Sequence, residues 1–244
     1  MEEIIKVEKL TKTYGSRKAV SNMNLSVNRG TAFALLGENG AGKSTAIECI
    51  LGTKRADSGN VSVLGYDPAA DRKTLFEKVG VQFQENNYQE KIIVTELCEV
   101  TASLYRKTAE PEYLLEKFGI LDKLKSPVEE LSGGQKQRLS VVLALLPEPE
   151  VVFLDELTTG LDTKARRAVW KTLSELKEKG LTILMTSHFM EEVEALCDEI
   201  CILKQGETVF YGAVDDAIRN SPCNKLEDAY LWYTDMEGTA DENF

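Results

Sequence analysis

Apolar and polar residues alternate along the first part of the chain with the short period that is typical of β-strands. Residues 4–36 predict strands separated by turns, and the last of these strands is the apolar run TAFALL (31–36). A glycine-rich loop follows and leads into a predicted helix that begins near Lys43. Residues 60–65 and 78–83 predict two further strands. The chain therefore begins with β-structure that one loop and one helix interrupt.

The pattern becomes helical from residue 95 to residue 146. Leu97, Val100 and Leu104 are predicted to share one face of a helix, and Pro111 is well placed to begin the next one. The last helix of this region carries an apolar stripe at spacings of three and four residues. The stripe consists of Leu139, Val142, Leu143 and Leu146.

The α/β pattern returns after Pro147. The run VVFLDE (151–156) predicts a buried strand that ends in two carboxylates, and residues 163–179 predict a helix. The run LTILMTSH (181–188) predicts another strand, and a hairpin that turns near Gly206 is predicted after it.

The order of these elements predicts one α/β domain over residues 1–222. Its core is expected at about residues 1–85 and 149–222, with a helical insertion at about 86–148. Residues 223–244 are expected to form a C-terminal tail, and its acidic and polar end, DMEGTADENF, is expected to be frayed.

Composition narrows the range of partners. The chain has 29 Lys and Arg residues against 40 Asp and Glu residues, so its net charge is −11. This charge repels the phosphate backbone of nucleic acids, and we expect no nucleic-acid partner, although a small positive pocket for one nucleotide is compatible with it. Five cysteines without zinc-ligand spacing favour free thiols in an intracellular protein. The start of the chain lacks the features of a signal peptide, and its apolar stretches are too short to span a membrane.

A phosphate-binding loop, GENGAGKST, occupies residues 37–45 and satisfies the pattern G-x-x-x-x-G-K-[ST]. Glycines let backbone N–H groups approach phosphates, and the dipole of the following helix adds positive potential. Lys43 supplies a mobile positive charge, and the Ser44 hydroxyl is a suitable ligand for Mg²⁺. The predicted nucleotide contacts in this loop are Gly37, Asn39, Gly40, Ala41, Gly42, Lys43, Ser44 and Thr45.

Two carboxylates at the end of VVFLDE are candidates for the chemistry. Sheets of this class place ligands at the C-terminal ends of their strands, so Asp155 is predicted to hold Mg²⁺ through water. Glu156 is predicted to orient the attacking water or accept its proton. Taken alone, two solvated acids at a strand end are an equally good interpretation, but the phosphate-binding loop favours the catalytic one. His188, the sole histidine, ends another strand and is predicted at the same site; a solvated strand end is the alternative.

A second glycine pair occurs in LSGGQ (131–135), which opens a predicted helix. Ser132 is predicted to cap this helix, while Gly133 and Gly134 let the backbone approach a phosphate. One chain thus carries two separate motifs suited to phosphate binding.

Together these motifs resemble the ATP-binding cassette (ABC) ATPases of transporters. The order of the features is the same in that family: Tyr14, the loop 37–45, Gln84, LSGGQ, VVFLDE, GLD and TSH. The resemblance covers almost the whole chain. It implies an α/β fold with a P-loop NTPase core, an N-terminal antiparallel β subdomain and an inserted α-helical subdomain. It also implies ATP hydrolysis, with ATP and Mg²⁺ bound.

The resemblance explains the two phosphate-binding motifs. In this family two cassettes associate head to tail, and each ATP lies between the loop of one subunit and the LSGGQ motif of the other. Ser132, Gly133, Gly134 and Gln135 are therefore expected to bind the ATP of a second ABC ATPase subunit, in what we expect to be a homodimer. Asp162, in GLD, is expected to organise the interface between the subunits.

Further roles follow from the resemblance one residue at a time. Tyr14 is expected to stack on adenine, although an ordinary partly buried tyrosine is the alternative. Gln84 is expected to reach Mg²⁺ and the attacking water and to report the nucleotide state to the helical insertion, with Gln82 as a rival. His188 is expected to contact the γ-phosphate. The expected Mg²⁺ ligands are Ser44, Gln84 and Asp155, and the expected catalytic residues are Glu156, His188 and Gln84.

One position departs from the family pattern. The family usually has the sequence DEPT, whereas Leu157 replaces the proline here. Leucine frees a backbone N–H group and loosens φ after Glu156. Because both acids are intact, we expect altered turnover and not an inactive site.

The C-terminal part of the chain resembles one branch of the family. Its sequence NKLEDAYLWYTDMEG is similar to the LED-x-[FY]-L tail of ATPase subunits in bacterial and archaeal exporters of drugs and antibiotics. This implies integral membrane permease subunits as partners, an unknown exported substrate, and a cytoplasmic position on the inner face of the cell membrane. An ABC-type ATPase that acts on a soluble complex and an importer ATPase subunit are the alternatives.

Overall fold

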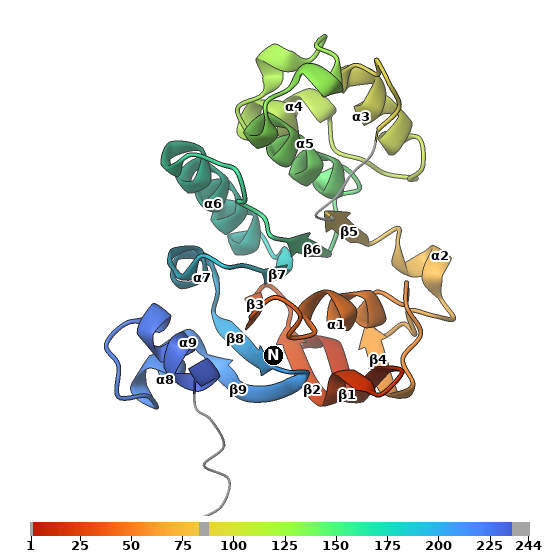
Figure 1. Cartoon of the computed structure of the whole chain (residues 1–244). Coiled ribbons are helices and arrows are strands. Elements are labelled where there is room, and N and C mark those ends of the chain that lie inside the picture. Colours follow the sequence, from red (N-terminus) through yellow and green to blue (C-terminus); the bar gives the residue numbers. More distant parts are fainter. Residues whose placement is uncertain (1, 83–87, 236–244) are drawn as a thin grey trace, which may run out of the picture.

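The computed structural model describes residues 2–82 and 88–235, which form two β-sheets with helices around them (Figure 1). A six-stranded sheet runs through the middle of the molecule in the spatial order β5-β6-β7-β3-β8-β9. Its neighbouring strands are parallel, except that β9 pairs antiparallel with β8. The strand bounds are β3 (Ala32–Gly37), β5 (Val79–Gln82), β6 (Val151–Asp155), β7 (Thr182–Thr186), β8 (Glu199–Lys204) and β9 (Glu207–Ala213).

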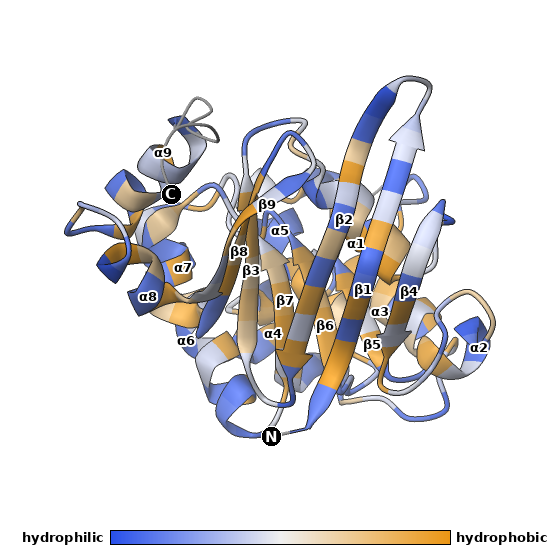
Figure 2. Cartoon of the chain, turned by 90° about the horizontal axis from the view of Figure 1, so that it is seen from below, coloured by the Kyte–Doolittle hydropathy of each residue, from blue (hydrophilic) through white to orange (hydrophobic). Residues whose placement is uncertain are grey.

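A three-stranded antiparallel sheet lies beside the larger one. Its central strand, β1 (Glu3–Tyr14), pairs with β2 (Arg17–Asn28) on one side and β4 (Ser58–Val63) on the other. The alternation of hydrophobic and hydrophilic residues along β1 and β2 is visible in Figure 2. It buries one face of the sheet, where Ile5 opposes Val27 in β2. The predicted N-terminal antiparallel β subdomain and α/β core are confirmed.

The strand β3 connects two hydrophobic cores because its side chains alternate between the faces of the central sheet. Phe33 and Leu35 belong to the core that also contains β1, β2 and the helix α1 (Lys43–Ile50). Ala34 and Leu36 belong to the core shared with the helices on the opposite face. All four side chains are fully buried, which fixes the strand that leads into the phosphate-binding loop.

The helical insertion forms the upper part of the molecule in Figure 1. Its helix α4 begins at Pro111, as predicted, and the stripe residues Leu139, Val142 and Leu146 are fully buried. The bounds of its elements are α3 (Val94–Ala102), α4 (Pro111–Lys117), η1 (Leu121–Lys123), η2 (Val128–Glu130) and α5 (Gly133–Leu145).

The predicted face of α3 is partly wrong. Leu97 is buried, but Val100 is 56% and Leu104 is 72% exposed, and the helix ends at Ala102, before Leu104. Val94, Leu97 and Cys98 form the face that packs on the core, and Val100 lies on its flank. The side chains of Val100 and Leu104 therefore reach solvent.

The remaining helices cover the central sheet and its ends. The long helix α6 begins directly after Asp162 and follows the strand β6. Helix α9 packs with fully buried Leu226 and Ala229 on the core that contains α8 and β8. Figure 1 shows α7, α8 and α9 together at one end of the molecule. The bounds are α2 (Arg72–Leu75), α6 (Thr163–Glu178), α7 (Met190–Leu196), α8 (Val214–Arg219) and α9 (Leu226–Asp235).

Candidate active site

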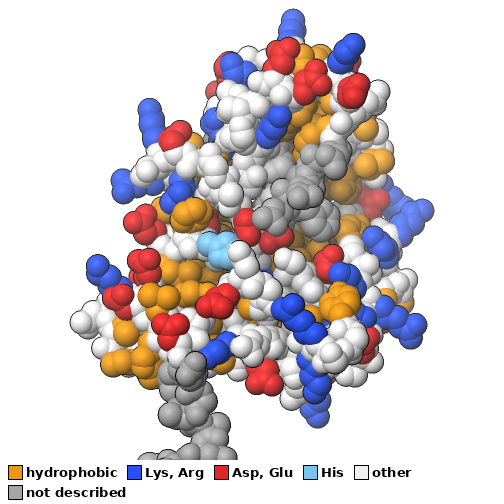
Figure 3. Space-filling model, in the orientation of Figure 1, with side chains coloured by type: hydrophobic (Ala, Val, Ile, Leu, Met, Phe, Trp, Pro, Cys, Tyr) orange, Lys and Arg blue, Asp and Glu red, His pale blue; other side chains and the backbone are white. Residues whose placement is uncertain are grey.

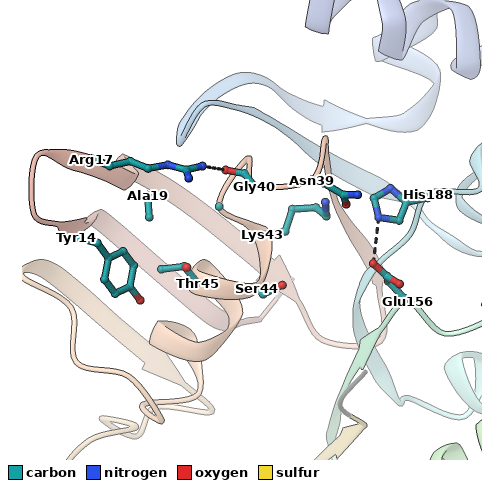
Figure 4. Close-up of a pocket in the computed structure, with 11 residues that line it drawn as sticks. Tyr14, Arg17, Ala19, Asn39, Gly40, Lys43, Ser44, Thr45, Glu156 and His188 are labelled. Carbon is teal, nitrogen blue, oxygen red and sulfur yellow. Dashed lines mark hydrogen bonds and ion pairs between the residues drawn. The ribbon is translucent and has the colours of Figure 1, made fainter. Parts of the chain in front are cut away.

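A pocket of about 770 Å³ opens where the C-terminal ends of β3, β6 and β7 meet the end of β1 (Figure 4). Its volume is within the usual range for a small-molecule site. The residues that line it are Tyr14, Arg17, Ala19, Asn39, Gly40, Gly42, Lys43, Ser44, Thr45, Glu156 and His188. Most of them come from the phosphate-binding loop, and the rest come from three separate segments of the chain.

The phosphate-binding loop has a backbone that only glycine adopts easily. Gly40 and Gly42 have φ values of 81° and 109°. A Cβ at Gly42 would also collide with the carbonyl oxygen of Ala19 in β2. Gly42 is the N-cap of α1, and neither a side-chain cap nor an acidic residue in the first turn neutralises the helix N-terminus. The N-terminal amides and the helix dipole therefore favour an anion here.

Two contacts from outside the loop hold its backbone. The guanidinium group of Arg17 donates to the carbonyl oxygen of Gly40 at 2.6 Å. The N–H of Gly206, at the turn between β8 and β9, donates to the carbonyl oxygen of Ala41 at 2.9 Å. Both sides of the loop are thus fixed by elements distant in sequence, which preorganises the amides.

Lys43 is buried and its ammonium group lies inside the loop. Its Nζ donates to the carbonyl oxygens of Gly37 at 2.7 Å and Glu38 at 3.1 Å. Burial lowers the pKa of Lys43, while the charges of Glu156 and Asp155 act in the opposite direction. The lysine thus lies between the loop backbone and the two acids.

The two predicted acids lie at the end of β6 and are held by the neighbouring strand. Thr186 of β7 donates from Oγ1 to Oδ1 of Asp155, and the same hydroxyl oxygen accepts the backbone N–H of Glu156 at 3.0 Å. Glu156 has a φ of 51°, in the left-handed region. Its Oε1 lies 3.1 Å from Nε2 of His188. The acids, the histidine and the loop are therefore brought together as the sequence predicts.

The side chains at this site are of the kind that Mg²⁺ uses beside a nucleotide. Such an ion takes one or two protein oxygens and completes its shell with phosphates and water. Asp155 and the exposed hydroxyl of Ser44 are oxygen donors of this kind. No cluster of three or more His, Cys, Asp and Glu side chains suited to a protein-only metal site occurs in residues 2–82 and 88–235.

The LSGGQ motif is at the N-terminus of α5, and none of its residues lines the pocket. Ser132 caps the helix as predicted: its Oγ accepts the N–H of Gln135 at 3.3 Å, and Oε1 of Gln135 accepts the N–H of Ser132 at 2.9 Å. Asp162 also lies outside the pocket, where its Oδ1 accepts the N–H of Ala165 and caps α6. Backbone hydrogen bonds, above all the one from Ala165, lower the pKa of Asp162.

Tyr14 lies at the end of β1 and is 45% exposed. The ammonium groups of Lys12 and Lys54 lie 5.7 and 5.3 Å from the centre of its ring. Gln82, the rival to Gln84, ends β5 and is buried. Gln84 itself lies outside the described residues.

Three side chains with clear contacts to the site were missed by sequence reasoning. Arg17 holds the loop, Thr186 holds both acids, and Gln137 of α5 donates from Nε2 to the carbonyl oxygens of Glu156 and Leu157 at 3.1 and 2.9 Å. Thr186 lies within the run LTILMTSH, two residues before the histidine, and this position is the one signal that could have drawn attention to it.

The sequence of residues 20–159, which contains the loop, the LSGGQ motif and both acids, matches the family described as ABC transporter. The chain belongs to the ABC transporter family. This ABC protein is 40% identical to Nod factor export ATP-binding protein I of Rhizobium etli over 214 residues, which cover 86% of this chain and 68% of that protein. It is 36% identical to linearmycin resistance ATP-binding protein LnrL of Bacillus subtilis over 221 residues, covering 87% and 70%.

A solved structure of the ATP-binding subunit of an ABC transporter superposes on this ABC protein with a TM-score of 0.86 at 30% identity, covering 94% of this chain and 99% of the other. The predicted ATP-hydrolysing activity and the resemblance to exporter ATPases are thereby confirmed. Within the part of the chain that the structure describes, no helix has the length and apolarity needed to cross a bilayer.

Proposed function

We propose that this ABC ATPase is the energy-supplying subunit of an exporter. Two copies close around two ATP molecules and drive separate permease subunits in the membrane. The observation that carries the proposal is that the two phosphate-binding motifs of the chain lie at separate sites. The loop, Glu156 and the histidine line one pocket, while the LSGGQ motif, also suited to phosphate, is not part of its lining.

The pocket supports ATP as the ligand because its parts match the parts of a nucleotide. Tyr14 offers a half-exposed aromatic ring for the adenine, and the loop amides with Lys43 offer positive potential for the phosphates. Mg²⁺, held through Asp155 and Ser44 with Gln84 as a further ligand, would neutralise charge that develops on the phosphates.

Hydrolysis is assigned to the pair formed by Glu156 and His188. The carboxylate orients the attacking water and accepts its proton, which general-base catalysis requires. His188 lies 3.1 Å from that carboxylate, so it is assigned the roles of orienting the acid and contacting the γ-phosphate. Thr186 and the left-handed backbone at Glu156 fix the direction of the side chain.

The LSGGQ motif supports dimerisation because it has features that its own chain does not use. A Cβ at Gly133 would meet no atom within 4 Å, and the residue has no left-handed φ. Glycine at this position is therefore not required by the packing of one chain, whereas a second chain's phosphate needs close backbone approach. Ser132 is exposed beside it, and Asp162 is exposed at the N-terminus of α6. These residues are assigned to the interface between the two copies.

The permease contact is assigned to the helical insertion. Val100 and Leu104 are exposed apolar side chains on it, and Figure 3 shows hydrophobic side chains at the surface of this part of the molecule. Tyr88, an aromatic residue of the same insertion, packs partly buried against the core, and burial raises its pKa to about 12. Val100 and Leu104 are thus better placed than Tyr88 to contact a partner. Such a contact positions the ATPase on the inner face of the membrane.

Export is favoured over import because the relatives' names refer to export and to resistance. The test is a pull-down of the tagged chain from solubilised membranes, followed by ATP-dependent transport in vesicles. We expect the chain to co-purify with an integral membrane protein. The double substitution Val100→Glu and Leu104→Glu should prevent this co-purification without loss of ATPase activity. Capture of a soluble complex with no membrane protein would favour the alternative ABC function.

A further inference from the structure

Helix α5 touches both halves of the proposed ATP machinery. Its N-terminus carries Ser132 and the glycines of LSGGQ, none of which lines the pocket. Five residues further along, or about 7.5 Å along the helix axis, Gln137 reaches the catalytic segment of its own chain. Its Nε2 donates to the carbonyl oxygen of Glu156 at 3.1 Å and to that of Leu157 at 2.9 Å.

The amide of Gln137 completes the support of the Glu156 backbone. Thr186 accepts the N–H of Glu156 and Gln137 donates to its carbonyl oxygen, so both polar backbone groups of this residue are held by side chains. The two acceptors are carbonyl oxygens, which only the NH₂ end of the amide can satisfy. Glu156 has a left-handed φ of 51°, a conformation that non-glycine residues adopt only when their surroundings hold it.

The residue after Glu156 makes this support more important. Proline at position 157 would restrict φ through its ring, and Leu157 does not. Leu157 is fully buried, which anchors its side chain, and its carbonyl oxygen is the second acceptor of Gln137. In this chain the backbone at positions 156 and 157 is held by two hydrogen bonds from Gln137 of α5 and by the N–H of Thr159, which also donates to the carbonyl oxygen of Glu156 at 3.2 Å.

We propose that Gln137 is a positioning residue that makes hydrolysis at Glu156 depend on the ATP bound in the other site of the dimer. The inference rests on the proposed function, in which the N-terminus of α5 binds the partner subunit's ATP. A helix of this length moves as a rigid body, so a shift of its N-terminus towards that ATP also moves the amide of Gln137. The carbonyl groups of Glu156 and Leu157 follow, and the carboxylate changes its direction towards the attacking water.

The test uses mixed dimers in which only one subunit hydrolyses ATP. The partner subunit carries either Glu156→Gln, which keeps ATP bound, or Lys43→Ala, which weakens ATP binding. The ratio of the two hydrolysis rates in the active subunit measures the coupling between the sites. We expect a ratio of roughly 5–150 when the active subunit is otherwise unchanged, as large as the factor by which one binding site typically changes the affinity of another.

Gln137→Met in the active subunit should bring this ratio close to one, because methionine has a similar length and no N–H donor. Gln137→Lys should restore part of the ratio, since its ammonium group can donate to the same carbonyl oxygens. Lys136→Met is the matched control: Lys136 also donates to a backbone carbonyl, that of Glu129, but has no contact with the catalytic segment. This control should keep the full ratio.

Thermal unfolding and ATP binding by each separate subunit show whether the variants fold. The inference would be overturned if a folded Gln137→Met dimer kept the rate ratio of the unsubstituted active subunit. It would also be overturned if Lys136→Met lowered the rate ratio as much as Gln137→Met does. If the chain that carries Glu156→Gln alone forms no ATP-dependent dimer, the proposed function itself fails, and this result is distinguishable from failure of the inference.

Discussion

His188 and Glu156 are 32 residues apart in sequence, yet Nε2 of the histidine lies 3.1 Å from Oε1 of the carboxylate. They meet because β6 and β7 are adjacent and parallel, with Asp155 opposite Thr186 at their C-terminal ends. Each residue follows its strand by only one or two positions. The parallel sheet therefore assembles the proposed catalytic pair directly from its register.

Glu156→Gln should keep ATP binding and lower hydrolysis by roughly 10²–10⁴-fold, the usual contribution of a general base. This corresponds to about 3–5 kcal/mol of activation free energy. The amide has the same size but cannot accept the proton of the attacking water. Steady-state phosphate release and equilibrium binding of ATP measure the two effects, and light scattering should detect an ATP-bound dimer. Turnover like that of the unsubstituted chain would remove Glu156 from the catalytic assignment.

The two phosphate-binding motifs should be separable by substitution. Ser132→Arg should abolish ATP-driven dimerisation because a large cation fills the position beside Gly133, while ATP binding by the monomer stays nearly intact. Lys43→Ala should weaken binding to the monomer itself, since the loop loses its buried ammonium group. Equilibrium binding measures the affinity of the monomer for ATP, and analytical ultracentrifugation measures ATP-driven dimerisation. Loss of monomer binding in Ser132→Arg would contradict the assignment of LSGGQ to the second subunit.

The motifs that could be predicted from the sequence are those whose chemistry depends on residues that are adjacent in the sequence. The loop 37–45 forms a phosphate site from consecutive amides, and VVFLDE ends a strand in two adjacent acids, so each pattern is local. Arg17, Gln137 and Thr186 act through contacts with residues 19 to 31 positions away, and their spacing in the sequence does not indicate these contacts. Such partners follow from the packing of strands and helices.

The same distinction explains the partly wrong prediction for α3. Helical spacing from Leu97 to Val100 and Leu104 is a local property and predicts a shared face. The core contact is instead made by Val94, Leu97 and Cys98, because α3 meets α4 and α5 on that side. Periodicity predicts that a helix has an apolar face, whereas the neighbouring helices determine which residues are covered.

Thr186→Val should impair both hydrolysis and stability. Valine has nearly the same shape but loses the donor to Asp155 and the acceptor for the Glu156 N–H, which leaves a backbone group without its partner. We expect a loss of about 1–3 kcal/mol in the free energy of unfolding and a lower kcat.

The matched control for Thr186 is Thr182→Val on the same strand. Thr182 is also fully buried, and its hydroxyl accepts the N–H of Gly30 at 2.8 Å, at the end of the strand away from the site. This variant should lose similar stability and keep its kcat. Denaturant unfolding measures the stability of both variants, and steady-state ATPase assays measure their kcat. Equal kcat values for both variants would show that Thr186 has no positioning role.

Glu192 should make stability depend on pH. Its carboxyl group is fully buried in α7, where it accepts hydrogen bonds from Ser187 and from Nε1 of Trp170, and burial raises its pKa above the usual 4.5. The folded chain therefore holds this proton more tightly than the unfolded chain. The stabilisation is fully present below pH 4.5 and is lost as pH rises through the higher folded-state value.

Glu192→Gln should abolish that contribution, because the amide resembles the protonated carboxyl group at every pH. Its oxygen can still accept the N–H of Trp170, and its NH₂ group can face the hydroxyl of Ser187. The free energy of unfolding, measured in urea between pH 5 and 8, should decline less with rising pH in the variant than in the unsubstituted chain. Glu191→Gln, one residue earlier and exposed, is the control and should leave the slope unchanged. Parallel pH profiles for Glu192→Gln and the unsubstituted chain would show that Glu192 is already ionised in the folded protein, with its hydrogen bonds outweighing its burial.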